Sequence, residues 1–302
     1  MRMFRETAPA FPVDHGAGPG IGSTIEPPPS AHTSAAPLPT IELAGARFHA
    51  ISEARCVQHI CDEVASGRSG WVVTMNLDHL RRFVRDREYA DLCRRATLLV
   101  ADGAPVVWAS RVQGTPLPER VAGSNMVWSL SEALGARGGS IFFLGGDPGT
   151  AEAAAATLAR RSGGLKIAGV HCPPLGFEKD QRAMDTLRAA LRAAAPDVVY
   201  VALGSPKQEV LIDRLRGELP RTWWMGVGIS FSFLCGRVRR APLWMQRAGL
   251  EWVHRLAQEP RRLMKRYLVD GLPFAGALLG GLVIRRACSA LRRFPVFNRH
   301  LR

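Results

Sequence analysis

The chain has 302 residues, of which 47% are hydrophobic and 22% are charged, so it is long enough and apolar enough to bury one substantial core. This composition excludes a chain that is disordered throughout. The formal net charge is +14, and the excess is local, because residues 237–302 hold fifteen lysines and arginines but only three acids. A basic segment of this kind suits a membrane surface, a nucleic acid or a phosphorylated ligand.

Residues 1–39 hold eight of the 21 prolines together with many glycines, alanines and serines. Such a composition cannot form a core, and we interpret this range as a disordered leader. Its start contains no apolar stretch of the signal-peptide type, so we expect the catalytic part to be cytoplasmic. The six cysteines are scattered without a CxxC pair, which favours reduced thiols and argues against a zinc site.

From residue 41 on, short apolar runs alternate with amphipathic segments. A hairpin is predicted over 41–51, turning at Ala44 and Gly45, and a helix over 52–66 with Ser52 as its N-cap. Strands are then predicted over 71–75, 97–101, 140–145, 165–170, 197–203 and 221–227. Helices are predicted between them, over 77–94, 104–112, 124–136, 148–162, 178–195 and 206–217.

This alternation of apolar strands with helices predicts an α/β fold with a doubly wound, mostly parallel sheet that is covered by helices on both faces. We assign residues 40–241 to this domain and residues 242–302 to a basic helical appendage. Ligands of such sheets bind beyond the carboxyl ends of the strands. Polar residues that directly follow a predicted strand are therefore the candidates for a functional site.

The appendage begins within a stretch, residues 236–268, in which nine basic residues are interleaved with tryptophans, methionines and leucines. One helix is predicted to end near Gln258 and the next to start at Pro260, which has no amide hydrogen to donate. Residues 271–284 are uncharged, but they are fewer than the roughly 20 residues that a membrane span needs. We interpret them as an interfacial or docked helix and leave open a tilted or re-entrant insertion.

Polar motifs follow the first two strands of the predicted sheet. Thr74 and Asn76 end the first strand in VTMNLDHL, and Asp102 ends the second in LLVADG. A carboxylate that projects from a strand end into a cleft can accept a proton from a substrate hydroxyl. The alternative is that Asn76 and Asp102 only cap the helices that follow them.

A third motif, PLPERVAGSNMV, places Arg120 just before a helix that starts near Gly123 and Ser124. An arginine there would hold an anion close to the unpaired amides of the helix N-terminus. Ser124 is also a natural N-cap, and this alternative stays open.

Glycine turns end the later strands. FFLGGDPG, with Gly145, is a weak signal, because many loops between a strand and a helix look this way. YVALGSPKQEVL is more specific, because Gly204 leads to Lys207, Gln208 and Glu209 on one helical turn. The sequence contains no Walker P-loop, complete GxGxxG, HExxH or DxD motif. The residues that hydride transfer or metal-dependent hydrolysis requires are therefore absent from its motifs, and we expect no metal or other cofactor.

Taken in order, the blocks TMN, ADG with VVWA, PERVAGS, LGSPKQE, GVG, GRVRRAP and LEWVHRLAQEPRR resemble the WecG/TagA/CpsF glycosyltransferase family over about residues 41–267. The resemblance implies a Rossmann-like fold that binds a uridine-diphosphate sugar. It implies inverting transfer of that sugar, without a required metal, to a polyprenyl-diphosphate-linked saccharide in cell-surface or exopolysaccharide biosynthesis. It also implies a peripheral location on the inner face of the cytoplasmic membrane.

By the same resemblance, Asp102 is the general base that deprotonates the acceptor hydroxyl, with Thr74 beside it. Arg255 and Arg262 resemble C-terminal arginines of the family that reach over the site as a lid toward the diphosphate. The candidate substrate-binding residues are Asn76, Arg120, Gly123, Ser124, Gly145, Gly204, Lys207, Gln208, Glu209 and Ser232.

The chain departs from the family pattern at two positions. Asn125 stands where the family commonly has an aspartate after GS, and Ser232 stands where it commonly has one after the GVG turn. By the resemblance, an aspartate after the GVG turn engages the nucleotide, whereas the hydroxyl of Ser232 can hydrogen-bond a ribose but without charge assistance.

Two other functions are weighed against the enzyme. One is a catalytically degenerate protein that binds a sugar nucleotide, which the two departures suggest. The other is a nucleic-acid-binding module, which would stack bases on Trp244 or Trp252 and bind with a steep salt dependence. Those tryptophans fit an apolar helix face better, so we expect no nucleic acid as partner. The predicted partners are a UDP-sugar, the lipid-linked acceptor and an anionic membrane surface. The sequence leaves the sugar, the acceptor saccharide and the oligomeric state open.

Overall fold

The computed structural model of the protein describes residues 37–293, and residues 38–293 form one compact unit. The predicted leader, residues 1–39, lies outside the described residues except for its last three.

The hairpin strands are β1 (Thr40–Leu43) and β2 (Ala46–His49). The sheet strands are β3 (Gly70–Met75), β4 (Leu98–Ala101), β5 (Ser140–Gly145), β6 (Lys166–His171), β7 (Val198–Ala202) and β8 (Trp223–Gly226). The helices among them are α1 (Glu53–Ala65), α2 (Leu77–Arg85), α3 (Arg87–Arg94), α4 (Ala104–Gln113), α5 (Gly123–Gly135), α6 (Thr150–Arg161), η1 (Phe177–Lys179), α7 (Gln181–Ala194), α8 (Lys207–Leu215), η2 (Arg216–Glu218) and α9 (Ser230–Leu234).

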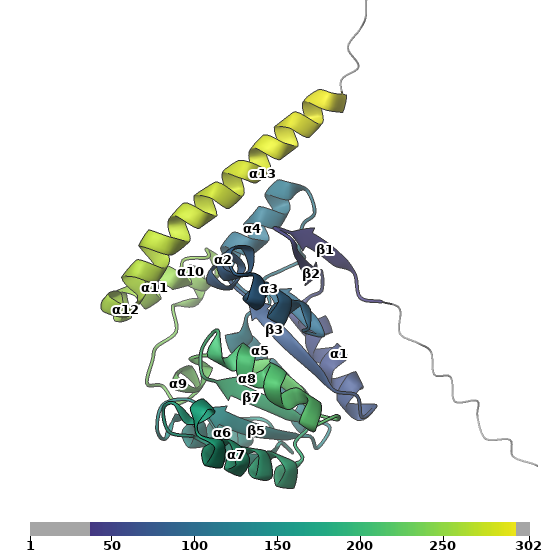
Figure 1. The fold of residues 1–302 in the computed structure, drawn as a ribbon, viewed down its shortest axis with the longest axis vertical. Coiled ribbons are helices and arrows are strands. Elements are labelled where there is room, and N and C mark those ends of the chain that lie inside the picture. Colours follow the sequence, from purple (N-terminus) through teal and green to yellow (C-terminus); the bar gives the residue numbers. More distant parts are fainter. Residues whose placement is uncertain (1–36, 294–302) are drawn as a thin grey trace, which may run out of the picture. The chain divides into compact units, whose positions relative to one another are not determined.

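The six sheet strands are all parallel and follow the order β4-β3-β8-β7-β5-β6. Of these, β3, β7 and β5 are labelled in Figure 1. Each predicted sheet strand is confirmed to within two residues at either end. The order places β3 beside β8, so strands from the two ends of the domain sequence meet inside the sheet. All their carboxyl ends lie on one edge, because the strands are parallel.

Helices cover both faces of the sheet, as the α/β prediction requires. Successive strand residues point to opposite faces, and β3 illustrates the result. Val73 belongs to a buried cluster with residues of α2, α3, α4, α7 and α8, whereas Val72 belongs to a second cluster with residues of α1, α5, α6 and α9. The predicted doubly wound α/β fold is therefore confirmed.

Two helix starts follow from side-chain caps, and one of them corrects a predicted helix. Ser52 accepts a hydrogen bond from the amide of Arg55 and caps α1, as predicted. The helix predicted over 77–94 is two helices, because Asp86 has extended backbone and its carboxylate accepts the amide of Tyr89 to start α3. The hydrophobic pattern continues across this break, so the pattern alone predicts one continuous helix.

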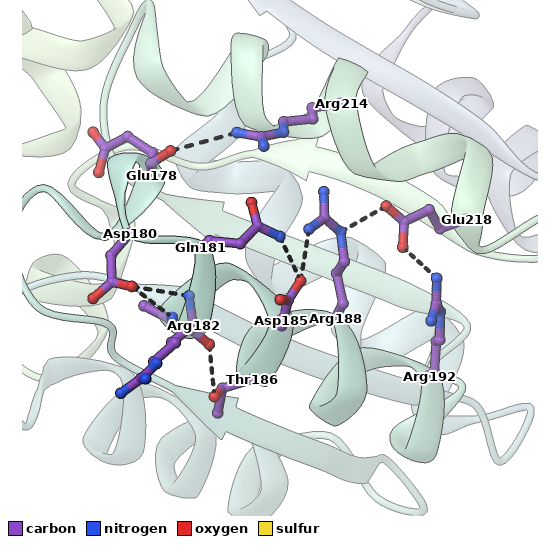
Figure 2. Close-up of polar contacts among 11 residues, drawn as sticks. Glu178, Asp180, Gln181, Arg182, Asp185, Thr186, Arg188, Arg192, Arg214 and Glu218 are labelled. Atoms are coloured by element: carbon purple, nitrogen blue, oxygen red, sulfur yellow. Dashed lines mark hydrogen bonds and ion pairs between the residues drawn. The ribbon is translucent and has the colours of Figure 1, made fainter.

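Ion pairs fix the helix that follows β6, and Figure 2 shows them. Asp180 accepts the amide of Arg182 at the start of α7. Glu218 of η2 accepts from Arg188 Nε at 2.9 Å and from Arg192 at 2.8 Å. These contacts tie α7 to the segment that leads into β8.

The appendage is a run of helices: α10 (Leu243–Arg247), α11 (Glu251–Gln258), α12 (Pro260–Met264), a π-helical segment η3 (Lys265–Gly271) and α13 (Leu272–Arg293). The predicted end at Gln258 and start at Pro260 are confirmed. The apolar helix is longer than predicted, since Pro260–Cys288 forms one helical stretch of 29 residues with a mean hydropathy of 1.7 in its most apolar window. By length and composition alone this stretch suffices to cross a membrane, which corrects the expectation that it is too short.

Polar contacts attach the appendage to α2 and α4. Asp78 of α2 pairs with Arg266 at 3.0 Å, and Arg81 of α2 lies 3.5 Å from Asp270. Arg286 donates to the carbonyl of Val112 in the last turn of α4 at 3.1 Å. Arg266 and Arg286 therefore contact the body of the protein, although a basic residue beside an apolar helix commonly binds lipid headgroups.

Candidate active site

The candidate site lies at the carboxyl ends of β3 and β4. The amide of Asp102 donates to Met75 O of β3 at 2.9 Å, which aligns the two strand ends. The amide of Val121 donates to Ala101 O of β4 at 2.8 Å, so the loop before α5 runs beside Asp102. The first amide of α5, that of Gly123, points at Asp102 Oδ2 over 3.4 Å.

Asp102 is not the cap of α4. The N-cap of that helix is Gly103, whose φ of 120° suits only glycine, and no side chain caps it. Burial raises the pKa of Asp102, and the charge of Glu251 acts in the same direction. Arg120, the Gly123 amide and His79 oppose this rise. A carboxylate with a raised pKa is a stronger base, which is what deprotonation of a hydroxyl requires.

Thr74 lies against the start of α5. A Cβ at Gly123 would lie 2.9 Å from Thr74 Oγ1, so glycine at this position allows the helix to approach the threonine hydroxyl. The Thr74 carbonyl lies 3.2 Å from His79 Nδ1. Thr74, Gly123 and Asp102 are therefore brought together, as the sequence predicted for the two side chains.

Asn76 caps α2, which confirms the structural alternative raised for it. Its Oδ1 accepts the amides of Asp78 at 3.0 Å and His79 at 3.1 Å. Ser124 is different, because the N-cap of α5 is Ala122 and no side chain caps that helix. The alternative that Ser124 is the N-cap of α5 is therefore wrong.

Arg120 forms an ion pair with the appendage. Its Nη1 donates to Glu251 Oε2 at 2.9 Å, and both side chains are mostly buried, with 21% and 16% exposed. Arg240 lies 3.5 Å from the other Glu251 oxygen and donates to Asn125 Oδ1 at 2.8 Å. Asn125, the first departure from the family pattern, therefore helps to hold the segment that leads into the appendage.

Gln208 locks the turn that follows β8. Its Nε2 donates to Glu209 Oε1 at 2.9 Å, and its Oε1 accepts the amide of Gly228 at 3.2 Å. Gln208 also lies so close to β8 that a Cβ at Gly226 would be 2.4 Å from its Nε2. Only 5% of Gln208 and 3% of Glu209 are exposed. The amide orientation of Gln208 is therefore fixed before any ligand binds.

A model of the glycosyl transferase WecG/TagA/CpsF family matches residues 41–287 of the chain. The chain belongs to this family. It is similar to a Bacillus spizizenii protein named N-acetylglucosaminyldiphosphoundecaprenol N-acetyl-beta-D-mannosaminyltransferase, with 32% identity over 195 residues, which cover 65% of this chain and 74% of the relative. A Bacillus subtilis protein of the same name is 33% identical over 192 residues, which cover 63% of this chain and 72% of that relative. The protein is therefore a glycosyltransferase.

We expect Gln208→Leu to cost this glycosyltransferase about 2 kcal/mol of folding free energy, because it leaves the Gly228 amide and the buried Glu209 carboxylate without their partner. Urea unfolding monitored by tryptophan fluorescence measures this loss. Val210→Ala on the same helix is the control, since Val210 is 54% exposed and should change stability by no more than about 0.5 kcal/mol. An unchanged unfolding midpoint for Gln208→Leu would contradict the proposed lock.

The other predicted residues of the later turns are placed as follows. Lys207 is exposed and pairs with Glu178 at 3.2 Å rather than pointing inward. Gly145 is explained by packing, since a Cβ there would lie 2.7 Å from the side chain of Leu203. Gly204 has a φ of 72° with open space around it, and Ser232 is buried in α9.

The two predicted lid arginines of the glycosyltransferase lie on different helices of the appendage. Arg255 of α11 has its guanidinium 5.7 Å from the Phe233 ring of α9, and its Nε has no hydrogen-bond partner among the described residues. Arg262 of α12 is more than half exposed and is bound to Glu259. Arg255 is thus held beside the turn that follows β8, whereas Arg262 faces solvent.

Sequence reasoning missed three residues of this glycosyltransferase site. His79 was hidden within the motif of Asn76, and Arg240 within a run of arginines. Glu251 could have been noticed, because it is one of only two acids within residues 236–268. Within residues 37–293, no group of three or more His, Cys, Asp or Glu side chains could hold a metal ion.

Proposed function

We propose that this glycosyltransferase moves a sugar from a uridine-diphosphate donor to a polyprenyl-diphosphate-linked saccharide. The observation that carries the proposal is Asp102: a carboxylate at a strand end, with a raised pKa, beside a helix N-terminus and an arginine. The names of both relatives contain an N-acetylmannosaminyl group and a diphosphoundecaprenol-linked N-acetylglucosamine. UDP-N-acetylmannosamine and this lipid are therefore the first pair of substrates to test.

The proposed reaction is a single displacement. Asp102 accepts the proton of an acceptor hydroxyl while that oxygen forms a bond to the anomeric carbon of the donor sugar. The bond from this carbon to the UDP oxygen breaks, and its electron pair leaves with the diphosphate. Attack from the side opposite the leaving group inverts the anomeric centre. In this proposal Thr74 lies beside the reacting atoms.

Arginines would stabilise the charge that grows on the leaving diphosphate. Arg120 lies beside Asp102, and Arg255 lies at the turn after β8. Fixed positive charges in a partly buried site stabilise such a transition state without a metal ion, and we propose that none is required. The donor half of the site would then lie on the β7–β8 side of Asp102, defined by Gly204 after β7, Gln208 beneath the turn after β8, and Ser232 in α9.

The test is incubation of the purified protein with radiolabelled UDP-sugars and a polyprenyl-diphosphate N-acetylglucosamine, followed by extraction of the lipid. Label in the lipid fraction supports the proposal. Donor binding without transfer favours the degenerate sugar-nucleotide-binding protein, and salt-sensitive binding of nucleic acid without transfer favours the nucleic-acid module. Either result would overturn the proposed function.

We also propose that the protein acts at the inner face of the cytoplasmic membrane, held there by α13. One side of this helix packs on the body through Phe274 and Leu282, which are 8% and 9% exposed. Three of its apolar residues are exposed, namely Leu272 at 51%, Val283 at 55% and Ile284 at 64%. An apolar helix surface flanked by basic residues suits a membrane with anionic lipids.

We expect the double substitution of Val283 and Ile284 by serine to weaken binding to anionic vesicles at least about tenfold, because two exposed apolar side chains no longer enter the lipid. Co-sedimentation with phosphatidylglycerol vesicles measures this binding. Leu175→Ser is the matched control, since Leu175 is 97% exposed and lies in the loop after β6. Equal binding by the double variant and the control would exclude this membrane contact.

A further inference from the structure

A cleft of about 470 Å³ lies beside the candidate site, between α4, the loop before α5 and α10. Trp108 and Arg111 line it from α4, Arg120 lines it from the loop, and Leu243 lines it from α10. It is large enough for a sugar with its phosphates, since ligand pockets commonly measure about 300–1,000 Å³. Arg120 is named above as a substrate-binding candidate, but Trp108, Arg111 and Leu243 have no ligand assigned to them.

The cleft combines an aromatic surface with positive charge. Trp108 is 43% exposed, so part of its ring is open to a ligand in the cleft. Gly249, at the turn between α10 and α11, packs on the indole so closely that a Cβ there would lie 3.0 Å from Trp108 Cζ2. The ring is therefore held in place by the appendage, with one surface left open. A fixed aromatic ring binds the apolar face of a sugar, and arginines bind its phosphates.

Two arginines line the cleft in different states. Arg120 donates one of its five N–H groups to Glu251, so the rest of its guanidinium is not used by this bond. Arg111 is exposed, and no ion pair joins it to any other residue in the described range 37–293. Arg120 also acts on the pKa of Asp102, so the end of the cleft that Arg120 lines is the end nearest the proposed base.

The position of the cleft separates it from the proposed donor half. β4 is an edge strand, and the donor half lies across β3 toward β8 and β7. The cleft begins at Ala104, two residues after Asp102, and none of its lining residues comes from the turns after β5, β7 or β8. Asp102 therefore stands between the two halves, where a base must stand to take a proton from the acceptor.

The far side of α4 carries the apolar helix. Figure 1 shows α13 (yellow) alongside α4, and Arg286 of α13 is bound to Val112 O in the last turn of α4. A prenyl chain attached to a diphosphate in the cleft would thus reach apolar surface without crossing the sheet. A nucleoside, by contrast, has no apolar chain to place on this surface.

We propose that the cleft between α4 and α10 binds the acceptor, with its sugar on Trp108 and its diphosphate on Arg111, while Arg120 at the inner end of the cleft serves the leaving diphosphate of the donor. This inference rests on the proposed function and adds which substrate occupies which half of the site. The chemistry of a sugar diphosphate is shared by donor and acceptor. The experiment must therefore measure both substrates separately.

The test is binding of a polyprenyl-diphosphate N-acetylglucosamine with a short, water-soluble prenyl chain, and separately of UDP-sugar, by isothermal titration calorimetry. We expect Trp108→Ala and Arg111→Ala each to weaken acceptor binding about tenfold and to leave donor binding within about twofold. Trp108→Phe keeps a ring and should retain most of the acceptor affinity. Val84→Ala, at a position that is 50% exposed on α2, is the control and should change neither affinity.

Steady-state kinetics adds a readout that a structural defect would not give. The acceptor KM should rise in Trp108→Ala while the donor KM and the kcat at saturating acceptor stay near wild-type values. Weakened donor binding with unchanged acceptor binding, or no change in either, would overturn the inference. Calorimetry needs no turnover, so absence of transfer by the wild-type protein would refute the proposed function and leave the cleft assignment to be judged by binding alone.

Discussion

Asp102→Asn is expected to lower kcat/KM for sugar transfer by roughly 10²–10⁴-fold, the usual effect of removing a positioned general base. Asparagine keeps the shape of the side chain and can still accept the Gly123 amide, so the loop before α5 should stay in place. Transfer of radiolabel to lipid-linked acceptor measures the loss. Binding of UDP-sugar should change by less than about threefold, because the base acts on the acceptor hydroxyl.

The same substitution is expected to stabilise the fold near neutral pH. The pKa of Asp102 is raised above its ordinary value of 3.8, so the folded state holds the proton more tightly than the unfolded state. Stability is therefore lost as pH rises through the folded-state pKa, and the ionised carboxylate costs the fold free energy above it. Asp102→Asn removes that cost, so its melting temperature should exceed that of the wild type at pH 7–8, and the difference should shrink below pH 3.8.

Asp185→Asn is the control for both measurements, because its side chain is 59% exposed on α7 and its charge is well solvated. It should leave transfer unchanged and shift the melting temperature little at any pH. Full transfer activity in Asp102→Asn would remove the base from the proposed mechanism. A lower melting temperature than wild type at pH 8 would instead show that the carboxylate is stabilised by its surroundings.

The fold was predictable because buried parallel strands are continuous apolar runs, which the chain interrupts with clear helical segments. The break at Asp86 was not, because the hydrophobic period of α2 and α3 continues across it and only the cap separates them. The length of α13 was underestimated for a related reason. The uncharged run ends near Ile284, but arginine is a good helix former, and the helix continues to Arg293.

Residues of the site were predictable only where a polar residue stands at the carboxyl end of an apolar strand. Thr74 and Asp102 follow apolar runs directly, so their meeting at one edge of the sheet follows from parallel topology. The role of Gln208 in fixing the turn after β8 depends on contacts between side chains that no local pattern encodes. The pairing of Arg120 with Glu251 joins residues 131 positions apart, and only the packing of the appendage brings them together.

That pairing leads to the second prediction with a large effect. The negative charge of Glu251 raises the pKa of Asp102. Glu251 also pairs with Arg120, whose positive charge lowers the pKa of Asp102. Glu251→Gln removes both influences, so the pKa of Asp102 should fall, and the acidic limb of the kcat/KM profile should move to lower pH. Because a weaker base deprotonates the acceptor less well, we expect on the order of tenfold slower transfer at pH 7.5. A full pH–rate profile of the wild type and the variant measures both effects.

Glu251→Gln should also destabilise the fold by about 2 kcal/mol, because Arg120 and Arg240 lose a charged partner in a mostly buried network. Glu63→Gln breaks a similar ion pair, with Arg68 at the end of α1, and should leave the acidic limb in place. A limb that also stays in place in Glu251→Gln would contradict the coupling between the appendage and the base.

The double variant Asp102→Asn, Glu251→Gln separates the two consequences of this contact. In the wild type, losing Glu251 removes a partner of two arginines but also removes a negative charge that opposes ionisation of Asp102, so the two effects partly cancel. With asparagine at position 102 only the first effect remains, and Glu251→Gln should cost more stability than it does in the wild type. Equal costs in the two backgrounds would mean that Glu251 acts on Arg120 and Arg240 but not on Asp102. A larger cost in the double variant would mean that the appendage sets the charge state of the base as well as closing over it.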